Sequence, residues 1–366
     1  MSTNCATTDG TARYIDRFAG RAANGHFREA QGHALSSIGI GTYLGNPDVA
    51  TDENYANAVV RAVQLGVNVI DTAANYRFQR SERSIGHALK TLAGEGYQRD
   101  ELMICTKGGY LPFDGEPPRN VREYVNETFV KPGIAAFDDF VGGSHCMTPS
   151  YLQNQLDQSL RNMDLDCVDV YYIHNPESQL GQVSESEFYH RITIAFERLE
   201  ANRQQGKLAY YGVATWNGFR TPADSREHHS LVRMFEIASA IGGDDHGFRF
   251  IQLPFNLAMP EALSLANEKI DGDPITVLEA AFRMDVSVMV SASMLQGRVA
   301  RGLPDNIRQA LGSLPTDAQT AIQFVRSTPG ITTALVGMSS VAHVEENLAL
   351  AEKEPAGPEA FAALWE

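Results

Sequence analysis

Four ionisable side chains lie at or just beyond the ends of hydrophobic runs, where they could act on one bound molecule. Asp71 ends the first run and Tyr76 follows it in a predicted turn, while Lys107 and His174 end two later runs. Burying a lysine or a histidine costs free energy unless the group is paired or used. Tyr76 would supply a weak acid, and Lys107 a positive charge that lowers the pKa of that acid. Asp71 would hold the lysine and His174 would donate a neutral hydrogen bond, so the set suits proton transfer to an oxygen atom.

These residues also have simpler interpretations. An aspartate after a strand often forms a turn, and a tyrosine often packs. A lysine at a strand end is also what Schiff-base chemistry requires, so a lyase or aldolase using Lys107 as its amine is one alternative. Asp71 and Tyr76 argue against it because they favour a charged lysine. The adjacent pair His145-Cys146 has no further ligands at metal-binding spacing and predicts no metal site.

Eight hydrophobic runs alternate with segments of helical periodicity, which predicts one α/β domain built as a single (β/α)8 TIM barrel. The barrel is expected over 35–366, after an N-terminal extension at 1–34. An open doubly wound sheet is the alternative architecture. The predicted strands are 37–43, 67–71, 102–107, 167–174, 208–215, 250–253, 286–291 and 331–337. The predicted helices are 53–65, 81–92, one that begins after Thr148-Pro149, 188–205, 226–240, 260–284 broken at Pro274, 316–327 and 341–351.

Composition narrows the classes of partner. The 366 residues carry a formal net charge of −15, which argues against nucleic acid or an anionic membrane as a partner. We find no apolar run of membrane-spanning length and no signal-peptide pattern at the start. The cysteines show no metal-ligand spacing, and we expect reduced thiols in a cytoplasmic protein. They are Cys5, Cys105, Cys146 and Cys167.

Short motifs around these residues occur in an order that resembles the aldo-keto reductase superfamily, from about Leu35 onward. They are Ile38–Tyr43 (IGIGTY), Asp71–Tyr76 (DTAANY), Lys107, Tyr171–His174 (YYIH), Gly212–Trp216 (GVATW), Gln252–Asn256 (QLPFN), and Gly337–Ser340 (GMSS) through Glu346-Asn347. The resemblance implies an NAD(P)-dependent oxidoreductase that transfers hydride between nicotinamide and a carbonyl or alcohol substrate. Tyr76 would be its general acid and base, assisted by Lys107 and Asp71, and His174 would orient the substrate oxygen.

The resemblance also implies which residues bind the cofactor. They are Gly41, Thr42, Tyr43, Asp71, Thr215, Gln252, Ser293, Leu295, Gly297, Gly337, Ser339, Ser340, His343, Glu346 and Asn347. NADP is the implied cofactor, and NAD stays open because His343 is the one basic candidate near the expected 2′-phosphate site. Two positions depart from the family pattern: Ala214-Thr215 replaces a Ser-Asn pair, and Ala292 replaces an aromatic that stacks on nicotinamide. These departures leave a low-turnover cofactor-binding sensor or scaffold as a further alternative.

The segment 108–147 interrupts the alternation after the third strand and is far longer than most strand-to-helix connections. It mixes aromatic and acidic residues, and we expect it to fold over the barrel mouth as a lid that forms much of the substrate pocket. A solvated decoration or an oligomer contact is the alternative, and the oligomeric state stays open. Because the sequence ends soon after Asn347, we expect little help from a C-terminal tail.

The expected substrate is an aldehyde, a ketone or a sugar derivative, bound near Tyr43, Tyr110 and Trp216. Relatives in the superfamily often place a small hairpin before the barrel, and we expect one between Phe27 and Ser36.

Overall fold

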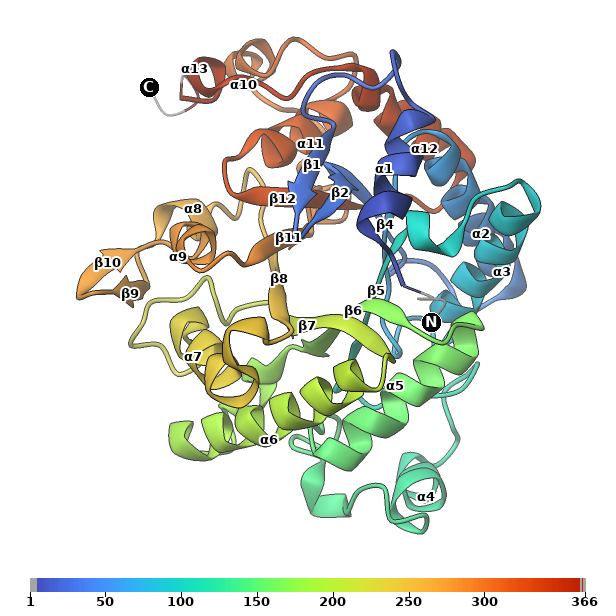
Figure 1. The fold of residues 1–366 in the computed structure, drawn as a ribbon, viewed down its shortest axis with the longest axis vertical. Helices are drawn as coiled ribbons and strands as arrows, with labels where there is room; N and C mark the ends of the chain where they lie inside the picture. Colours follow the sequence, from blue (N-terminus) through green and yellow to red (C-terminus); the bar gives the residue numbers. More distant parts are fainter. Residues whose placement is uncertain (1–4, 363, 365–366) are drawn as a thin grey trace.

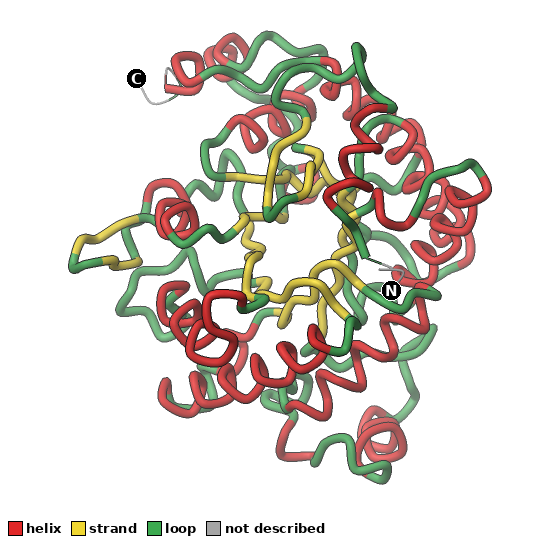
Figure 2. Tube along the Cα trace, in the orientation of Figure 1, coloured by secondary structure: helices red, strands yellow, loops and turns green. Residues whose placement is uncertain are grey.

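The computed structural model describes residues 5–362 and 364, and these form a closed barrel of parallel strands surrounded by helices (Figures 1 and 2). The barrel order is β11-β12-β3-β4-β5-β6-β7-β8, which confirms the predicted (β/α)8 fold. Its strands are β3 (Ile38–Gly41), β4 (Val69–Asp71), β5 (Met103–Gly108), β6 (Val168–His174), β7 (Leu208–Ala214), β8 (Phe248–Pro254), β11 (Ser287–Ser291) and β12 (Ile331–Gly337). Each coincides with a predicted strand.

Several helices outside the barrel begin at a side-chain cap. Asp48, Ser184 and Thr316, for example, accept a hydrogen bond from a backbone N–H in the first turn of the helices that follow them. The main helices are α2 (Val49–Gln64), α3 (Arg80–Gly94), α5 (Pro149–Met163), α6 (Glu185–Gln204), α7 (Leu231–Gly242), α9 (Val277–Arg283), α11 (Asp317–Ser327) and α12 (Val341–Leu348). Shorter ones are α8 (Glu261–Ser264), α10 (Asp305–Ala310) and α13 (Pro358–Ala362).

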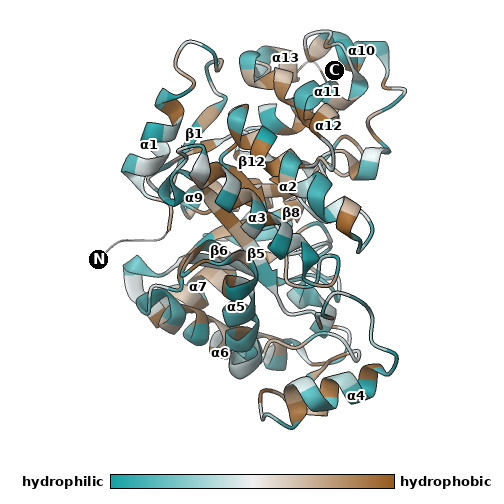
Figure 3. Ribbon diagram, turned by 90° about the vertical axis from the view of Figure 1, so that its right-hand side faces the viewer, coloured by the Kyte–Doolittle hydropathy of each residue, from teal (hydrophilic) through white to brown (hydrophobic). Residues whose placement is uncertain are grey.

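The core has two layers. Side chains that point into the barrel, such as Met103, Tyr172 and Phe250, form an inner cluster. A larger cluster joins the outer faces of the strands to the apolar faces of the helices. Figure 3 shows this division, with brown concentrated at the strands and teal on the outer sides of the helices. The loops at the carboxyl ends of the strands lie outside this core, and in barrel enzymes these loops supply the catalytic residues.

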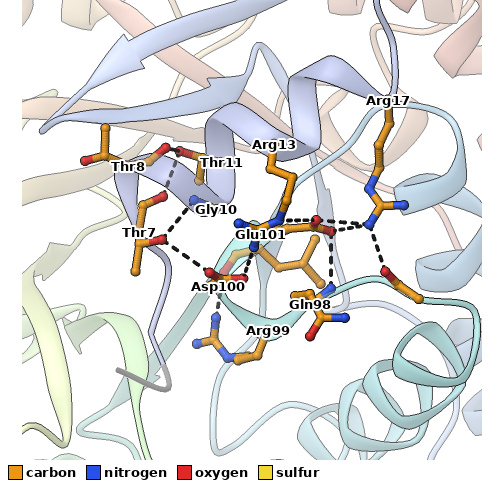
Figure 4. A network of polar contacts seen from close by, with 12 residues as sticks. Thr7, Thr8, Gly10, Thr11, Arg13, Arg17, Gln98, Arg99, Asp100 and Glu101 are labelled. Carbon is orange, nitrogen blue, oxygen red and sulfur yellow. Dashed lines mark hydrogen bonds and ion pairs between the residues drawn. The ribbon is translucent and has the colours of Figure 1, made fainter. Parts of the chain in front are cut away.

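An N-terminal segment closes the end of the barrel where the strands begin. It contains helix α1 (Thr8–Asp16) and the antiparallel pair β1 (Phe27–Ala30) and β2 (His33–Ser36), at the place where the sequence predicts a hairpin. Figure 4 shows how α1 is fastened. Arg17 donates to both carboxylate oxygens of the fully buried Glu101 at 3.0 and 3.1 Å, and Arg13 bridges Glu101 and Asp100. Because Glu101 is withdrawn from water, removing these arginines would leave its charge uncompensated.

The expectation that all cysteines are reduced is wrong for one pair, because Cys5 and Cys167 form a disulfide. Their Cα atoms lie 5.5 Å apart although 162 residues separate them in the chain. The pairing arises because the segment before α1 passes the start of β6, where the backbone N–H of Ala6 donates to Asp169. Cys105 and Cys146 are free and buried. Since disulfides are rare in cytosolic proteins, the argument from reduced thiols to a cytoplasmic location fails for this pair.

The predicted helix at 260–284 is also wrong. Two helices, α8 and α9, flank a small antiparallel hairpin made of β9 (Glu268–Ile270) and β10 (Asp273–Ile275). Asp271 and Gly272 form its two-residue turn with φ values of 55° and 90°. An Asp-Gly turn with both residues at positive φ is a strong hairpin signal, and it interrupts the helical periodicity.

The insertion at 108–147 folds beside the barrel instead of over its mouth. It contains helix α4 (Val121–Val125), a π-helical turn (Asn126–Val130) and a 3-10 turn (Phe137–Asp139), and α4 lies at the outer edge of the molecule in Figure 1. Phe129 and Phe140 pack with Tyr151 of α5 in a separate hydrophobic cluster. Several of its acids form local contacts, such as Asp114 with Arg83. The lid prediction is therefore wrong, because the aromatics are used to build the insertion's own core.

Candidate active site

A cavity of about 880 Å³ opens at the carboxyl ends of the barrel strands. Three of the predicted catalytic residues, Asp71, Tyr76 and His174, line it. Lys107 lies directly beneath, with 1% of its surface exposed. The register of the sheet explains the arrangement, since Asp71 pairs with Cys105 on β5 and Lys107 with Tyr172 on β6, which puts neighbouring strand ends side by side. The structure thus brings all four residues together.

Lys107 and Asp71 form a buried ion pair. The ammonium Nζ of Lys107 lies 2.6 Å from Oδ2 of Asp71 and also donates to the carbonyl oxygen of Thr72 at 2.7 Å. The amide of Gln252 donates to the other carboxylate oxygen of Asp71 at 2.8 Å. Burial alone would lower the pKa of Lys107, but the charge and hydrogen bond of Asp71, together with the neighbouring Tyr76 and Cys105, outweigh it and raise that pKa. Lys107 is therefore charged at neutral pH.

Tyr76 lies on the loop after β4 and contacts this pair from the cavity side. Nζ of Lys107 is 5.0 Å from the centroid of the Tyr76 ring. Burial raises the pKa of Tyr76, and the charge of Lys107 opposes that rise without reversing it. The net lowering expected from the sequence is therefore absent, because the hydroxyl is withdrawn from water. Tyr76 is a neutral phenol at neutral pH, which is the form that can donate a proton.

A strained turn directly after Tyr76 holds it in place. Arg77, Phe78 and Gln79 have φ values of 47°, 58° and 69°, in the left-handed region that non-glycine residues rarely adopt. The guanidinium of Arg77 is buried, pairs with Asp52 of α2 and donates to Ser81 at 3.1 Å. These contacts fix a conformation that the backbone would otherwise leave. The sequence predicts a turn near Tyr76 but gives no sign of its left-handed conformation, because none of these three residues is a glycine.

His174 faces Tyr76 from the end of β6. The two ring centroids are 5.8 Å apart, and the ring of Tyr110 lies 5.1 Å from the His174 ring on another side. Burial lowers the pKa of His174 well below its usual value, and the positive charge of Lys107 adds to the effect. The imidazole is thus neutral near pH 7. Its Nδ1 is buried and has no hydrogen-bond partner among the described residues.

Most of the predicted cofactor residues share the cavity with the catalytic group. Those that line it are Gly41, Thr42, Tyr43, Asp71, Thr215, Gln252, Ser293, Leu295, Gly297, Gly337, Ser339, His343, Glu346 and Asn347. The exception is Ser340, whose hydroxyl accepts from the backbone N–H of His343 at 3.3 Å as the N-cap of α12. The hydroxyls of Ser293 and Thr215 also have protein partners, namely the carbonyl of Leu335 and the N–H of Gly218. By contrast, Oδ1 of Asn347 is buried without a partner in the part of the chain that is described.

An arginine that lines the cavity was not predicted from the sequence. Arg301 lies in the loop between β11 and α10, lines the cavity, is exposed, and forms no ion pair within the described residues. The signal was available, because Arg298 and Arg301 are three residues apart in a stretch without an acid on an otherwise acidic chain. An arginine without an ion pair, in a cavity that Ser339 and His343 also line, is a ready partner for a phosphate group.

The three predicted substrate residues also line the cavity. Tyr43 and Trp216 are unusually exposed for aromatic side chains, at 56% and 42%, and Tyr110 is the sole contribution of 108–147, a segment that the structure describes in full. The ring of Tyr43 meets that of Tyr76 edge to face at 4.9 Å. Asn175 also lines the cavity, and its side-chain amide donates to the hydroxyl of Tyr110 at 3.4 Å. Exposed rings around a polar centre make the cavity mouth aromatic.

Within residues 5–362 and 364, no group of three or more His, Cys, Asp or Glu side chains is placed to hold a metal ion. None of the described helices is both long and apolar enough to cross a membrane.

Comparison with known proteins gives the family. A model of the aldo/keto reductase family matches residues 37–222, a span that includes Asp71, Tyr76, Lys107 and His174. The chain belongs to the aldo/keto reductase family. Membership confirms the predicted class of enzyme, an NAD(P)H-dependent oxidoreductase.

Individual relatives are distant. The uncharacterized oxidoreductase YqkF of Bacillus subtilis strain 168 is 20% identical over 342 residues, which cover 90% of this chain and 92% of that protein. The NADH-specific methylglyoxal reductase of Escherichia coli strain K12 is 26% identical over 185 residues, or 49% of this chain and 48% of that protein. A crystal structure of an aldo/keto reductase from Klebsiella pneumoniae with NADP and acetate has a TM-score of 0.63 and 19% identity, covering 93% of this chain and 94% of that one. At this identity the structural likeness shows the fold.

Proposed function

We propose that this protein is an NADP(H)-dependent oxidoreductase that interconverts a carbonyl group and an alcohol, with Tyr76 as general acid and base. The observation that carries the proposal is the meeting of Tyr76, the buried Lys107–Asp71 pair and His174 at one cavity. A buried cation beside a phenol, with a neutral imidazole opposite, is an arrangement that exchanges a proton with a polarised oxygen.

Each residue has a separate task in the reduction. Bound nicotinamide supplies the hydride. The Tyr76 hydroxyl donates its proton to the substrate oxygen, and the positive charge of Lys107 stabilises the phenolate that is left behind. Asp71 holds Lys107 in position through the 2.6 Å contact. His174, kept neutral by burial, donates to the same substrate oxygen and orients it.

The cavity fits a dinucleotide cofactor. Gln252 would hold the carboxamide of nicotinamide, because its amide nitrogen is committed to Asp71 and its oxygen remains to accept a hydrogen bond. At the other end, the unpartnered Oδ1 of Asn347 would accept from the amino group of adenine. Arg301 and His343 are basic residues that line the same cavity as Ser339, where the 2′-phosphate of NADP would bind. They favour NADP, and NAD stays an alternative because one distant relative is NADH-specific.

The aromatic mouth suggests the kind of substrate. Tyr43, Tyr110 and Trp216 present rings around the catalytic residues, and aromatic rings pack well on the flat apolar faces of sugars. We therefore favour a sugar derivative over a simple aldehyde or ketone. The Schiff-base alternative finds no support, because Lys107 is buried beneath the cavity and its amine is committed to Asp71 and Thr72.

The experiment has two steps. Fluorescence titration with NADPH and NADH identifies the preferred cofactor, and a panel of aldehydes, ketones and sugar carbonyls is then assayed with it. Tyr76→Phe should abolish turnover and leave the Kd for the cofactor unchanged. Tyr211→Phe is the matched control, because Tyr211 is a buried tyrosine outside the cavity and the variant should retain turnover. Equal activity of Tyr76→Phe and the wild type would refute the mechanism.

A cofactor-binding sensor with little turnover is the second candidate. Ala292 lines the cavity where the family pattern expects an aromatic side chain that stacks on nicotinamide. The nicotinamide ring would therefore make fewer contacts at this position. Trp216 lines the same cavity and could replace that contact. Stopped-flow mixing of the NADPH complex with active carbonyl compounds decides the matter. Rapid loss of NADPH absorbance supports the enzyme, whereas tight NADPH binding without oxidation by any carbonyl supports the sensor.

A further inference from the structure

The two ends of the insertion meet directly beneath His174. The backbone N–H of Cys146 donates to the carbonyl of Gly109 at 2.9 Å, and that of Leu111 donates to Ser144 at 2.7 Å. These contacts make a short antiparallel neck in which Tyr110 faces His145. The insertion therefore leaves the barrel after β5 and returns to the same place, bringing the side chain of His145 to the end of β6.

The ring of His145 is fully committed. With 1% of its surface exposed, it lies between the backbone of His174 and the side chain of Gln179. Its Nε2 is 2.8 Å from the carbonyl oxygen of His174, and its Nδ1 is 3.1 Å from Nε2 of Gln179. A carbonyl can only accept, so Nε2 of His145 must carry the proton and Nδ1 must accept from the amide. Gln179 is oriented in turn by Arg191, which donates to its oxygen at 2.9 Å.

His174 needs such support because its own ring lacks it. A functional histidine is usually oriented by a hydrogen bond to its second nitrogen. Nδ1 of His174 has no partner among the described residues, so packing and the backbone must do this work. The ring of Tyr110 contacts both histidines, with its centroid 5.1 Å from each. Next in the chain, Asn175 has a φ of 45°, so the backbone turns sharply where the His174 carbonyl is held.

We propose that His145 is a positioning residue, which holds the end of β6 so that the His174 ring meets the substrate oxygen. The insertion then serves as a buttress behind the site, with its aromatic cluster keeping the neck closed. The inference rests on the proposed function, because it assigns His174 to the substrate oxygen. Burial lowers the pKa of His145 to about 4, so the tautomer that donates to His174 persists through the neutral range.

The test compares two substitutions at His145. His145→Leu removes the donor, whereas His145→Gln can place an amide N–H near the position of Nε2. We expect His145→Leu to lower kcat by about 100-fold, the size of effect that a misplacement of about 1 Å produces. His145→Gln should recover most of that loss, and the Kd for NADPH should be unchanged in both. His229→Leu is the matched control, because His229 is another fully buried histidine and lies outside the cavity.

Several outcomes would overturn the inference. Wild-type kcat in His145→Leu, or equal losses in the Leu and Gln variants, would show that the donated hydrogen bond does not matter. If His145→Leu does not fold, Gln179→Met replaces it, because it removes the partner of Nδ1 and leaves the neck intact. Gln179→Met should lower kcat by a smaller factor than His145→Leu is expected to, and an unchanged kcat overturns the inference.

A spectroscopic measurement separates this inference from the proposed function. If the wild type reduces no carbonyl, the proposed function fails, and the 15N resonances of the histidine rings decide the role of His145. In the wild type, Nε2 of His145 should be the protonated nitrogen at pH 7. The ring resonances of His174 should shift in His145→Leu and stay in place in His229→Leu. A protonated Nδ1 with a bare Nε2 at His145, or unshifted His174 resonances, would reject the support role.

Discussion

Removing one member of the Lys107–Asp71 pair should destabilise the fold far more than removing both. At 2.6 Å the attraction between the two charges is about 6 kcal/mol for an effective dielectric constant of about 20. Withdrawing each ion from water costs several kcal/mol, so the pair as a whole contributes little to stability. A single substitution loses the attraction but retains one desolvation cost, and we expect it to lower the free energy of unfolding by about 3–5 kcal/mol.

The measurement is a double-mutant cycle of Lys107→Met, Asp71→Asn and the double variant. Urea unfolding followed by tryptophan fluorescence gives the free energy of each. The double variant should lose much less stability than the sum of the single losses predicts, with a coupling of about 6 kcal/mol, the size of the gross attraction. Asn at position 71 can keep a hydrogen bond with Gln252, which limits other effects of the substitution. Additive losses, with coupling below about 0.5 kcal/mol, would refute this account of the pair.

The Lys107→Met variant also has a predictable pH dependence. Burial raises the pKa of Asp71, and Lys107 opposes that rise, so removing the lysine raises the pKa further. A carboxyl group with a higher pKa in the folded state binds more protons when folded, so stability falls as pH rises above its unfolded pKa of about 3.9. Lys107→Met should therefore lose less stability relative to the wild type at pH 5 than at pH 8. An equal loss of stability at pH 5 and pH 8 would show that Lys107→Met destabilises the fold through lost packing and not through the charge of Asp71.

Three further predictions concern other parts of the structure. Burial lowers the pKa of His229 to about 3. Because a histidine with a lowered pKa binds fewer protons when folded, His229 should lower the free energy of unfolding of the wild type by about 2 kcal/mol between pH 8 and pH 5. His229→Leu should remove this part of the pH dependence in urea titrations at the two pH values. Arg77→Ala should lower kcat through Tyr76 by releasing the strained turn, while the Kd for NADPH stays unchanged, and a wild-type kcat would contradict the role of the Arg77–Asp52 pair. Arg301→Ala should weaken the binding of NADPH more than that of NADH in fluorescence titration. An equal loss of affinity for both cofactors would place Arg301 at the pyrophosphate.

The barrel and its catalytic group could be predicted because both depend on local signals. Val69 and Ile70 form a strand by their β-branched character, and a parallel barrel places every strand end at one rim. Asp71, Lys107 and His174 therefore meet whatever the loops do. Residues 260–284 show the converse, because a helical pattern there hid the Asp271-Gly272 turn.

Long-range contacts could not be predicted in the same way. Cys5 and Cys167 form a disulfide although 162 residues separate them, and no sequence pattern near either cysteine predicts the pairing. His229 falls inside the helix predicted at 226–240, yet it precedes α7 by two residues and is buried against Phe188 and Phe219. In both cases the neighbours come from distant elements, so composition and periodicity carry no information about them.

The insertion shows why an aromatic-rich segment can be assigned the wrong task. Aromatic rings are needed equally by a substrate pocket and by a small structure that must bury itself, and composition does not reveal which way they face. Phe129 and Phe140 turn inward against Tyr151, and this commits the insertion to the outside of the barrel. The same commitment fixes its neck, where Tyr110 reaches the cavity and His145 reaches the backbone of His174. A segment placed beside the mouth can thus control the chemistry through the residues at its two ends.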